Sequence, residues 1–452
     1  MIMYTKWKPR LRKNIYSDKL NEDYYFYYIP ESCSGIVYID GQLKNILDKC
    51  NGENSIEELG KIFNINIDEL KLIFDNIESY GMFINAKHEY TNKPRKKETP
   101  QIDAWLHITN KCNLNCTYCY IKKTNESMPI ELAKLYIDKM VEACKSINNG
   151  YISIRFAGGE PLLEINLIKS LIAYIEFNYP EYKFQYGIIT NGILLKDEKI
   201  VKYLLEKNIS VAVSLDGMEE YHNKTRIGAS NSNPFQETIY GMQVAEKCGL
   251  VPNILTTVAP ENLDGLTELT KYLSEKKLHF RYGLQKDLFN IPELVRINNQ
   301  LSNIIQECIS ILEQEIMDGN NHFEFNFNDI QFEYPVRRSC SAGTVGFGAG
   351  HNGKVALCGM TLVNPFSEIK IDSDLRKIME QHNKEISNFS INNIDECKIC
   401  IWKYACAAGC PAQNKSLFGR YEHGTPYCEA IKKIVPKYIH MIALKQWSSY
   451  KK

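Results

Sequence analysis

Hydrophobic and polar residues follow three successive patterns along this chain, and the first predicts a small domain. Short aromatic and β-branched runs at 24–29 and 35–40 are typical of strands. Apolar residues at helical spacing then predict helices at 55–63 and 67–80. We therefore expect a winged-helix-like unit of three strands and three helices over residues 1–90.

The second pattern alternates strands with helices, after a polar, proline-punctuated segment at 91–101 that we expect to be a linker. The alternation occupies residues 102–325. Such a series is typical of a parallel sheet curved into a barrel or partial barrel. The strand-like runs are 102–109, 151–156, 183–190, 210–216, 251–259 and 279–284.

The third pattern, over residues 326–452, is short of long apolar runs and rich in glycine and cysteine. A region of this composition is expected to depend on metal for its fold. A final amphipathic helix is predicted at 430–444. The cysteines of this region are Cys340, Cys358, Cys397, Cys400, Cys406, Cys410 and Cys428.

A separate cysteine group follows the first strand of the alternating segment. Cys112, Cys116 and Cys119 fall within eight positions, where the strand-to-helix loops of parallel folds carry catalytic residues. A structural zinc site normally has four ligands, and a disulfide would leave one cysteine over. The spacing therefore indicates a metal centre that keeps one coordination position for a ligand other than these cysteines.

Composition narrows the choice of partners. The formal net charge is zero, which gives no electrostatic basis for binding nucleic acid or a membrane surface. The sequence shows neither a membrane-length apolar run nor a signal-peptide core, so we expect a cytoplasmic protein without a membrane partner. Thiols stay reduced there, and 15 cysteines then indicate metal or redox chemistry rather than disulfides.

The run C-N-L-N-C-T-Y-C at 112–119 resembles the signature of radical S-adenosylmethionine (SAM) enzymes. The resemblance implies an α/β fold with a partial (βα)6 barrel, similar to a TIM barrel, over 102–325. It also implies that Cys112, Cys116 and Cys119 hold a [4Fe–4S] cluster whose open iron binds SAM. Reduction would then cleave SAM to a 5′-deoxyadenosyl radical. A structural zinc loop is the alternative.

Further loops resemble the SAM-binding motifs of the same family. F-A-G-G-E-P contains Gly158, Gly159 and Glu160, similar to the motif that receives the SAM ammonium group, although an ordinary turn is the alternative. Tyr118 would lie beside the adenine, unless it is a packed loop tyrosine. Arg226 would lie near SAM, unless it is a solvated surface arginine. The remaining implied SAM contacts are Asn191, Ser214 and Asp216.

The C-terminal cysteines resemble the seven-cysteine SPASM arrangement, which carries two auxiliary [4Fe–4S] clusters. The resemblance assigns Cys340, Cys358 and Cys410 to the first and Cys397, Cys400, Cys406 and Cys428 to the second, giving three clusters in all. A zinc ribbon over 397–410 is the alternative. Seven cysteines leave the first auxiliary cluster one ligand short. Cys308, Tyr334, water or a substrate cysteine could fill the place.

The N-terminal unit resembles the recognition element of enzymes that mature ribosomally made peptides. A leader peptide would add as a strand to the edge of its sheet. A DNA-binding winged helix is the alternative, but the helix after Ser55 is acidic, which opposes phosphate contact. The resemblance therefore implies a precursor peptide as partner and an electron donor such as flavodoxin or ferredoxin.

The function expected is that of a peptide maturase forming a Cys-to-carbon thioether crosslink. A carbon–carbon crosslink is one alternative. Another is a sulfatase maturase, a family in which an aspartate base follows the second SPASM cysteine, whereas Cys358 is followed here by Gly359. A non-enzymatic iron–sulfur redox protein is the third, although it would not need an open iron or the ordered SAM-binding loops.

Overall fold

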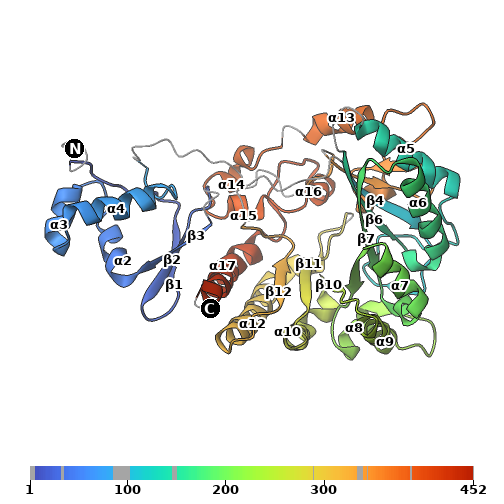
Figure 1. Ribbon diagram of the computed structural model, residues 1–452, viewed down its shortest axis with the longest axis horizontal. Helices are drawn as coiled ribbons and strands as arrows, with labels where there is room; N and C mark the ends of the chain where they lie inside the picture. The colour runs from blue at the N-terminus through green and yellow to red at the C-terminus, as the bar shows by residue number, and fades with distance from the viewer. Residues whose placement is uncertain are drawn as a thin grey trace.

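A computed structural model gives the fold of this protein (Figure 1). It describes residues 6–31, 35–84, 102–144, 150–288, 290–332, 340–343, 345–386 and 389–450. The predicted linker at 91–101 lies outside these residues. Among the described residues, no helix has the length and apolar character needed to cross a membrane.

The N-terminal unit, residues 6–84, contains the predicted three strands and three helices. Its antiparallel sheet has the order β1-β2-β3. The Ser55 hydroxyl and the Glu58 carboxylate form a reciprocal capping box at the start of α3, which fixes where that helix begins. The elements are β1 (Tyr16–Lys19), β2 (Tyr24–Tyr28), β3 (Ile36–Asp40), α2 (Gly41–Asp48), α3 (Ile56–Phe63) and α4 (Ile67–Glu78).

This small sheet packs on both faces. Alternate side chains such as Tyr27 and Val37 form a core with the three helices. Phe26 and Tyr28, on the other face, belong instead to the main core of the molecule. The N-terminal unit is therefore docked by one face of its sheet against the rest of the chain, beside α17 (Figure 1).

The main sheet has ten strands in the order β12-β11-β10-β8-β7-β6-β4-β13-β14-β15. All pairs from β12 to β13 are parallel, and β14 and β15 are antiparallel additions. The six predicted strands are present. The strands are β4 (Ile102–Thr109), β6 (Tyr151–Gly158), β7 (Lys183–Thr190), β8 (Ser210–Ser214), β10 (Asn253–Val258), β11 (His279–Leu284), β12 (Glu324–Phe327), β13 (Gly346–Ala349), β14 (Lys354–Ala356) and β15 (Ser367–Glu368).

Two of these strands extend the sheet beyond the predicted alternation. β12 crosses the boundary expected between residues 325 and 326, and β13 pairs directly with β4. Both are only four residues long, so their sequence patterns are weak. The C-terminal region, residues 340–450, thus shares one hydrogen-bonded sheet with the partial barrel.

Helices cover the outside of the curved parallel sheet (Figure 1). They are α5 (Ile130–Cys144), α6 (Ile165–Asn178), α7 (Glu198–Glu206), α8 (Glu219–Thr225), α9 (Pro234–Lys247), α10 (Leu266–Glu275), α11 (Glu293–Arg296) and α12 (Asn298–Met317). The predicted final helix is confirmed as α17 (Cys428–Tyr450), which packs along α12. The other C-terminal helices are α13 (Leu375–Ile386), α14 (Asp395–Lys398), α15 (Lys403–Cys406) and α16 (Pro411–Phe418).

Candidate functional site

The three clustered cysteines lie on the loop that follows β4, at the carboxyl end of the barrel. Cys116 is in the short strand β5 (Asn115–Cys116), which pairs with β9 (Arg226–Ile227) so that Cys116 lies opposite Arg226. Burial raises the pKa of the Cys112 and Cys116 thiols. Lys123, which the sequence interpretation did not select, donates to Cys119 Sγ at 3.2 Å and brings a positive charge to the thiols. Such a charge favours the thiolate form that binds metal.

The glycines after β6 bring a second loop against this one. The Gly159 N–H donates to Thr109 O at 2.7 Å, and the Glu160 N–H donates to Lys111 O at 2.7 Å. A Cβ atom on Gly159 would lie 2.0 Å from Lys111 O, and Gly158 has φ +127°. The close approach that needs glycine here is between two protein backbones.

The Glu160 carboxylate connects the loops after β6 and β7. It is fully buried, and it accepts hydrogen bonds from the Leu162 N–H at 3.0 Å and the Thr190 hydroxyl at 2.8 Å. Its other oxygen accepts from the Asn191 N–H at 2.8 Å. Burial raises the pKa of this carboxyl. Both oxygens are thus engaged by the protein, and the role predicted for Glu160 toward the SAM ammonium group stays a prediction.

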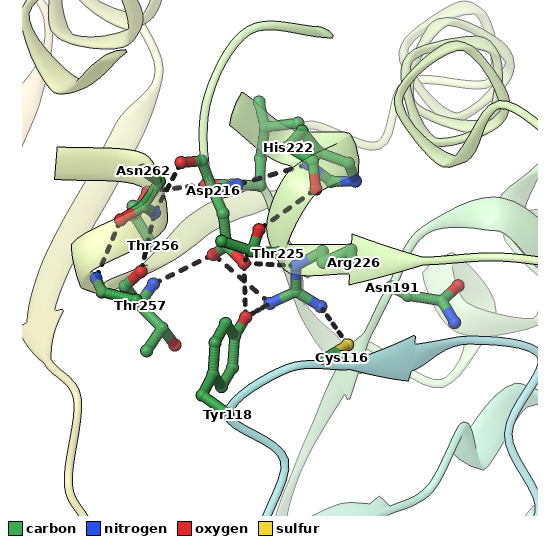
Figure 2. Close-up of polar contacts among 12 residues, drawn as sticks. Cys116, Tyr118, Asn191, Asp216, His222, Thr225, Arg226, Thr256, Thr257 and Asn262 are labelled. Atoms are coloured by element: carbon green, nitrogen blue, oxygen red, sulfur yellow. Dashed lines mark hydrogen bonds and ion pairs between the residues drawn. The ribbon is translucent and has the colours of Figure 1, made fainter. Parts of the chain in front are cut away.

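Asp216, directly after β8, is the centre of a second buried network (Figure 2). Its carboxylate accepts from Arg226 Nε at 2.7 Å, the Thr225 hydroxyl at 3.1 Å and the Thr257 N–H at 3.0 Å. The Tyr118 hydroxyl also donates to it. With no exposed surface and several protein donors, Asp216 holds the cysteine loop, β9 and the end of β10 together.

Arg226 places a buried positive charge beside the cysteine loop. One terminal nitrogen lies 3.8 Å from Cys116 Sγ, and the other donates to the Tyr118 hydroxyl at 2.6 Å. Burial opposes the charge, but Asp216, Tyr118 and Cys116 together outweigh it and raise the pKa of the guanidinium. Arg226 is 7% exposed, so the alternative of a solvated surface arginine is wrong.

Several members of this network were missed by the sequence interpretation. Asn262 Nδ2 donates to the Asp216 carbonyl at 2.7 Å and to the Thr257 carbonyl at 2.9 Å. His222 Nδ1 accepts from the Asp216 N–H at 3.3 Å, and burial, then Arg226, lowers the pKa of His222 to about 3. His222 lies in the same H-N-K-T-R run as Arg226, and that proximity was the available signal.

The other two predicted SAM contacts lie at neighbouring strand ends. Ser214 is buried at the end of β8. Asn191 follows β7, and its side-chain nitrogen donates to Asn113 Oδ1 at 2.7 Å in the cysteine loop. Figure 2 shows Asn191 beside the Asp216 network without a bond to it. Residues from the loops after β4, β6, β7 and β8 therefore converge at one edge of the sheet.

The SPASM resemblance divides the seven C-terminal cysteines into two sets. The first set is Cys340, Cys358 and Cys410, and within it burial, and then Cys358 and Cys340, raise the pKa of Cys410 to about 11. In the second set, burial, then Cys428 and Cys400, raise the pKa of Cys397 to about 12. Cys406 is coupled to Cys428 and Cys397 in the same way. The assignment of each set to one auxiliary cluster stays a prediction.

The donor chemistry of these sets fits iron–sulfur clusters, which thiolates normally hold. Within the described ranges, no three His, Cys, Asp or Glu side chains are arranged around a single metal ion. Cys308, a candidate extra ligand, is buried on α12 near Thr270 and Tyr282. Tyr334, the other candidate, lies outside the described residues.

His107 and Tyr120 lie between the cysteine loop and the first C-terminal set. The Tyr120 hydroxyl is 3.3 Å from His107 Nε2, and both Cys358 and Cys119 raise the Tyr120 pKa after burial. A Cβ atom on Gly359 would lie 2.3 Å from His107 Nε2. His107 therefore fills the space that a side chain at position 359 would need, and burial lowers its pKa to about 4.

The fold and this site are those of a partial parallel barrel with clustered thiols at the carboxyl ends of its strands. The sequence profile of the radical SAM superfamily matches residues 106–273. A protein of Methanocaldococcus jannaschii is 38% identical over 235 residues, covering 50% of this chain and 79% of that protein. Residues 106–273 therefore form a radical SAM domain, and this family implies SAM and a [4Fe–4S] cluster as cofactors.

Two further similarities differ in how much of the chain they cover. A cysteine-type anaerobic sulfatase-maturating enzyme of Clostridium perfringens is 24% identical over 339 residues, 71% of this chain and 91% of that enzyme. The Streptococcus suis protein SuiB, solved with its precursor peptide SuiA, has 16% identity and a TM-score of 0.50. That match covers 92% of this chain and 98% of SuiB. At this identity the likeness to SuiB concerns the fold.

Proposed function

We propose that this protein is a maturase of a ribosomally made precursor peptide and that it forms a Cys-to-carbon thioether in that peptide. The observation that carries the proposal is the coverage of the SuiB match. A match over 92% of the chain must include most of the N-terminal unit, and SuiB was solved with a precursor peptide. The sulfatase-maturating enzyme matches 71% of the chain.

The leader of the precursor would bind at the sheet of the N-terminal unit. β3 is an edge strand of this sheet, because it pairs with β2 on one side and with no other described strand on the other side. An extended peptide could therefore add beside β3 through backbone hydrogen bonds. The unit is docked against the C-terminal region, where Tyr16 and Tyr28 pack on Trp402, so a leader held there would keep the core peptide near that region.

The chain's own residues would prepare the reaction in three ways. Cys112, Cys116 and Cys119 would hold the SAM-binding cluster, and with SAM bound this cluster supplies the 5′-deoxyadenosyl radical. The Asp216–Arg226 pair fixes the cysteine loop against β8 and β10. Such fixed geometry accelerates a reaction by positioning its partners. An electron donor such as flavodoxin or ferredoxin would supply the reducing electron.

The first C-terminal set would position the substrate sulfur. Three thiols would supply three of the four ligands of a cluster. A soft thiolate from the core peptide suits the fourth coordination position. Thioether formation removes two hydrogens from the peptide, one as an atom taken by the radical and one as the thiol proton. The remaining electron would return to the redox centres of the protein.

A sulfatase-maturase activity is favoured by the 24% identical Clostridium enzyme. That family's aspartate base corresponds here to Gly359. A Cβ atom at position 359 would lie 2.3 Å from His107 Nε2. This chain therefore lacks both the aspartate and the space for its side chain. We therefore place this activity second.

Mass spectrometry of a co-expressed precursor, encoded near this protein, tests the proposal. We expect a loss of two hydrogens that requires a core cysteine and disappears when Cys112 is replaced by alanine. A loss of two hydrogens that persists after every core cysteine is mutated would support a carbon–carbon crosslink instead. Unmodified peptide, together with oxidation of a sulfatase peptide, would favour the second activity.

A further inference from the structure

A cavity of about 270 Å³ opens at the amino ends of the parallel strands. Asn253, His279 and Glu324 line it, and they are the first residues of β10, β11 and β12. From these amino ends the lining extends along the inner face of the sheet to Ile189 of β7 and Leu255 of β10. None of the residues assigned above to SAM or to a cluster lines the cavity.

Two arginines line this cavity from widely separated strands. Arg155 is on β6 and Arg281 is on β11, with β7, β8 and β10 between them in the sheet. Their side chains share one cavity because the sheet curves into a partial barrel. Arg281 is exposed at the mouth, yet the surrounding protein and then the charge of Arg155 lower its pKa. The two guanidiniums therefore repel each other across a confined space.

The arginine pair is not neutralised by direct ion pairs. Within the parts of the chain that the structure describes, neither guanidinium has an ion-pair or hydrogen-bond partner, although Arg155 lies 4.8 Å above the Trp105 ring. The carboxylate in the lining, Glu324, is 3.5 Å from His279 Nδ1. Arg226 at the other end of the barrel differs, since Asp216 pairs with it.

The lining has the chemistry of a carboxylate receptor. A guanidinium presents its donors in a planar fork that matches a carboxylate or another planar oxyanion. Gln185, Asn253 and Asn326 add amide groups to the same walls. The volume is at the small end of ligand sites, which begin at about 300 Å³, so the cavity suits a carboxylate group on a short side chain or small molecule.

We propose that this cavity binds a carboxylate between Arg155 and Arg281, at the amino ends of the barrel strands. The carboxylate could belong to a small dicarboxylic acid or to an acidic side chain of a peptide. In both cases the bound group would neutralise the paired guanidiniums. The negative charge of the ligand would attract both guanidiniums and offset their mutual repulsion.

Isothermal titration calorimetry on the full-length protein tests the proposal, with succinate and a short glutamate-containing peptide as probes at constant ionic strength. We expect saturable binding of at least one probe. Arg155→Gln and Arg281→Gln should each weaken that binding by about tenfold or more, because one charge-assisted pair is lost. Arg420→Gln removes a surface charge outside the cavity and is the matched control, expected to change affinity less than about twofold.

The variant Glu324→Gln tests whether the two arginines bind an anion or have only a structural role. Removing the one acidic group of the lining should tighten carboxylate binding, since a like charge is lost from the mouth. Arg281→Lys keeps the charge without the fork and should bind more weakly than the wild type but more tightly than Arg281→Gln. Circular dichroism confirms that each variant is folded.

The outcomes are distinct. Binding of succinate alone identifies a free small carboxylate as the ligand, and binding of the peptide alone identifies an acidic peptide. Absence of saturable binding of both probes by the wild type would overturn the proposal. Equal affinities in the wild type and in both Arg→Gln variants would overturn it as well.

Discussion

Two regions join segments that are far apart in the sequence, but by opposite means. One is the site at the carboxyl ends of the barrel strands, and the other is the junction where the N-terminal unit packs beside α17. Around Asp216, buried charges and hydrogen bonds fix Tyr118 and Arg226. At the junction, aromatic rings pack on one another, as Tyr24 and Trp447 do with centroids 4.5 Å apart and planes inclined by 47°.

The difference shows which property each region needs. A buried ion pair is costly to break and tolerates little displacement, so it suits a site whose loops must be held in one geometry. Aromatic packing gains stability from contact area and has less directional geometry. We therefore expect catalysis to depend on the first region and domain attachment to depend on the second.

The largest expected effect comes from the cysteine loop itself. Replacing Cys112, Cys116 and Cys119 together by alanine should abolish SAM cleavage and leave the junction intact. Formation of 5′-deoxyadenosine measures the first, and limited proteolysis of the N-terminal unit measures the second. Continued 5′-deoxyadenosine production would show that these cysteines do not hold the SAM-binding cluster. With two auxiliary clusters present, iron content should fall by about a third.

Asp216→Ala should be the most destabilising single change at this site. It leaves Arg226 as an unpaired buried charge, which costs about 3–5 kcal/mol of unfolding free energy. Chemical denaturation measures the loss. Asp264→Ala, at an exposed carboxylate, is the control and should cost less than about 0.5 kcal/mol. Adding Arg226→Met to Asp216→Ala should recover part of the stability, and a further loss would contradict this account.

Trp447→Ala should weaken the junction without affecting SAM cleavage. The ring packs on Tyr24 and Tyr38 and is half-buried. We expect a loss of about 2–3 kcal/mol, less than for a fully buried tryptophan, with faster proteolytic release of the N-terminal unit. Phe177→Ala removes an 85% exposed ring and serves as the control. Impaired SAM cleavage with an intact junction would reverse the roles given to the two regions.

The smallest effect depends on pH and tests whether charge also contributes to the junction. His440 Nδ1 lies 2.5 Å from the Glu313 carboxylate, which Lys437 shares, and His440 Nε2 is 3.2 Å from the Lys19 carbonyl of β1. The hydrogen bond to Glu313 raises the His440 pKa above 6.5, with Asp18 contributing. The charged imidazolium is therefore favoured in the folded state.

Since the folded-state pKa is raised, the stabilisation is complete below about pH 6.5 and is lost as pH rises through the folded pKa. The stability difference between wild type and His440→Gln should be on the order of 1 kcal/mol at pH 6 and should shrink toward pH 8. Denaturation curves across this range measure it. His322→Gln, at an exposed histidine, is the control, and a flat profile for His440→Gln would exclude the effect.

Local sequence patterns predicted much of the fold, because a buried parallel strand and an amphipathic helix have characteristic apolar periods. The resemblance to the SPASM pattern grouped Cys410 with Cys340 and Cys358 although they are far apart in the sequence, and this grouping stays a prediction. The docking face of the N-terminal sheet was not predicted. Tyr24 and Phe26 alternate with Tyr25 and Tyr27, so both faces are apolar and the pattern does not show that Trp447 covers one of them.

The network around Asp216 was only partly predictable for a related reason. Asp216 and Arg226 are close in sequence, but Tyr118 reaches them from the loop after β5 and Thr257 from β10. A single sequence without the fold does not reveal which residues, distant in the sequence, donate hydrogen bonds to a buried carboxylate. The same limit applies to His107, whose proximity to Gly359 depends on the C-terminal region joining the main sheet.

The pairing of β13 with β4 has a consequence for how the protein is made. Gly346 of β13 lies opposite Asp103 of β4, which is more than 200 residues earlier and leads into the cysteine loop. Ribosomes add about 5–20 residues per second, so the strand that leads into the cysteine loop waits on the order of tens of seconds for its last neighbour. Its open edge is exposed throughout that interval. We expect nascent chains to engage chaperones at this stage, and cofactor loading to begin only after the C-terminal region has been released from the ribosome.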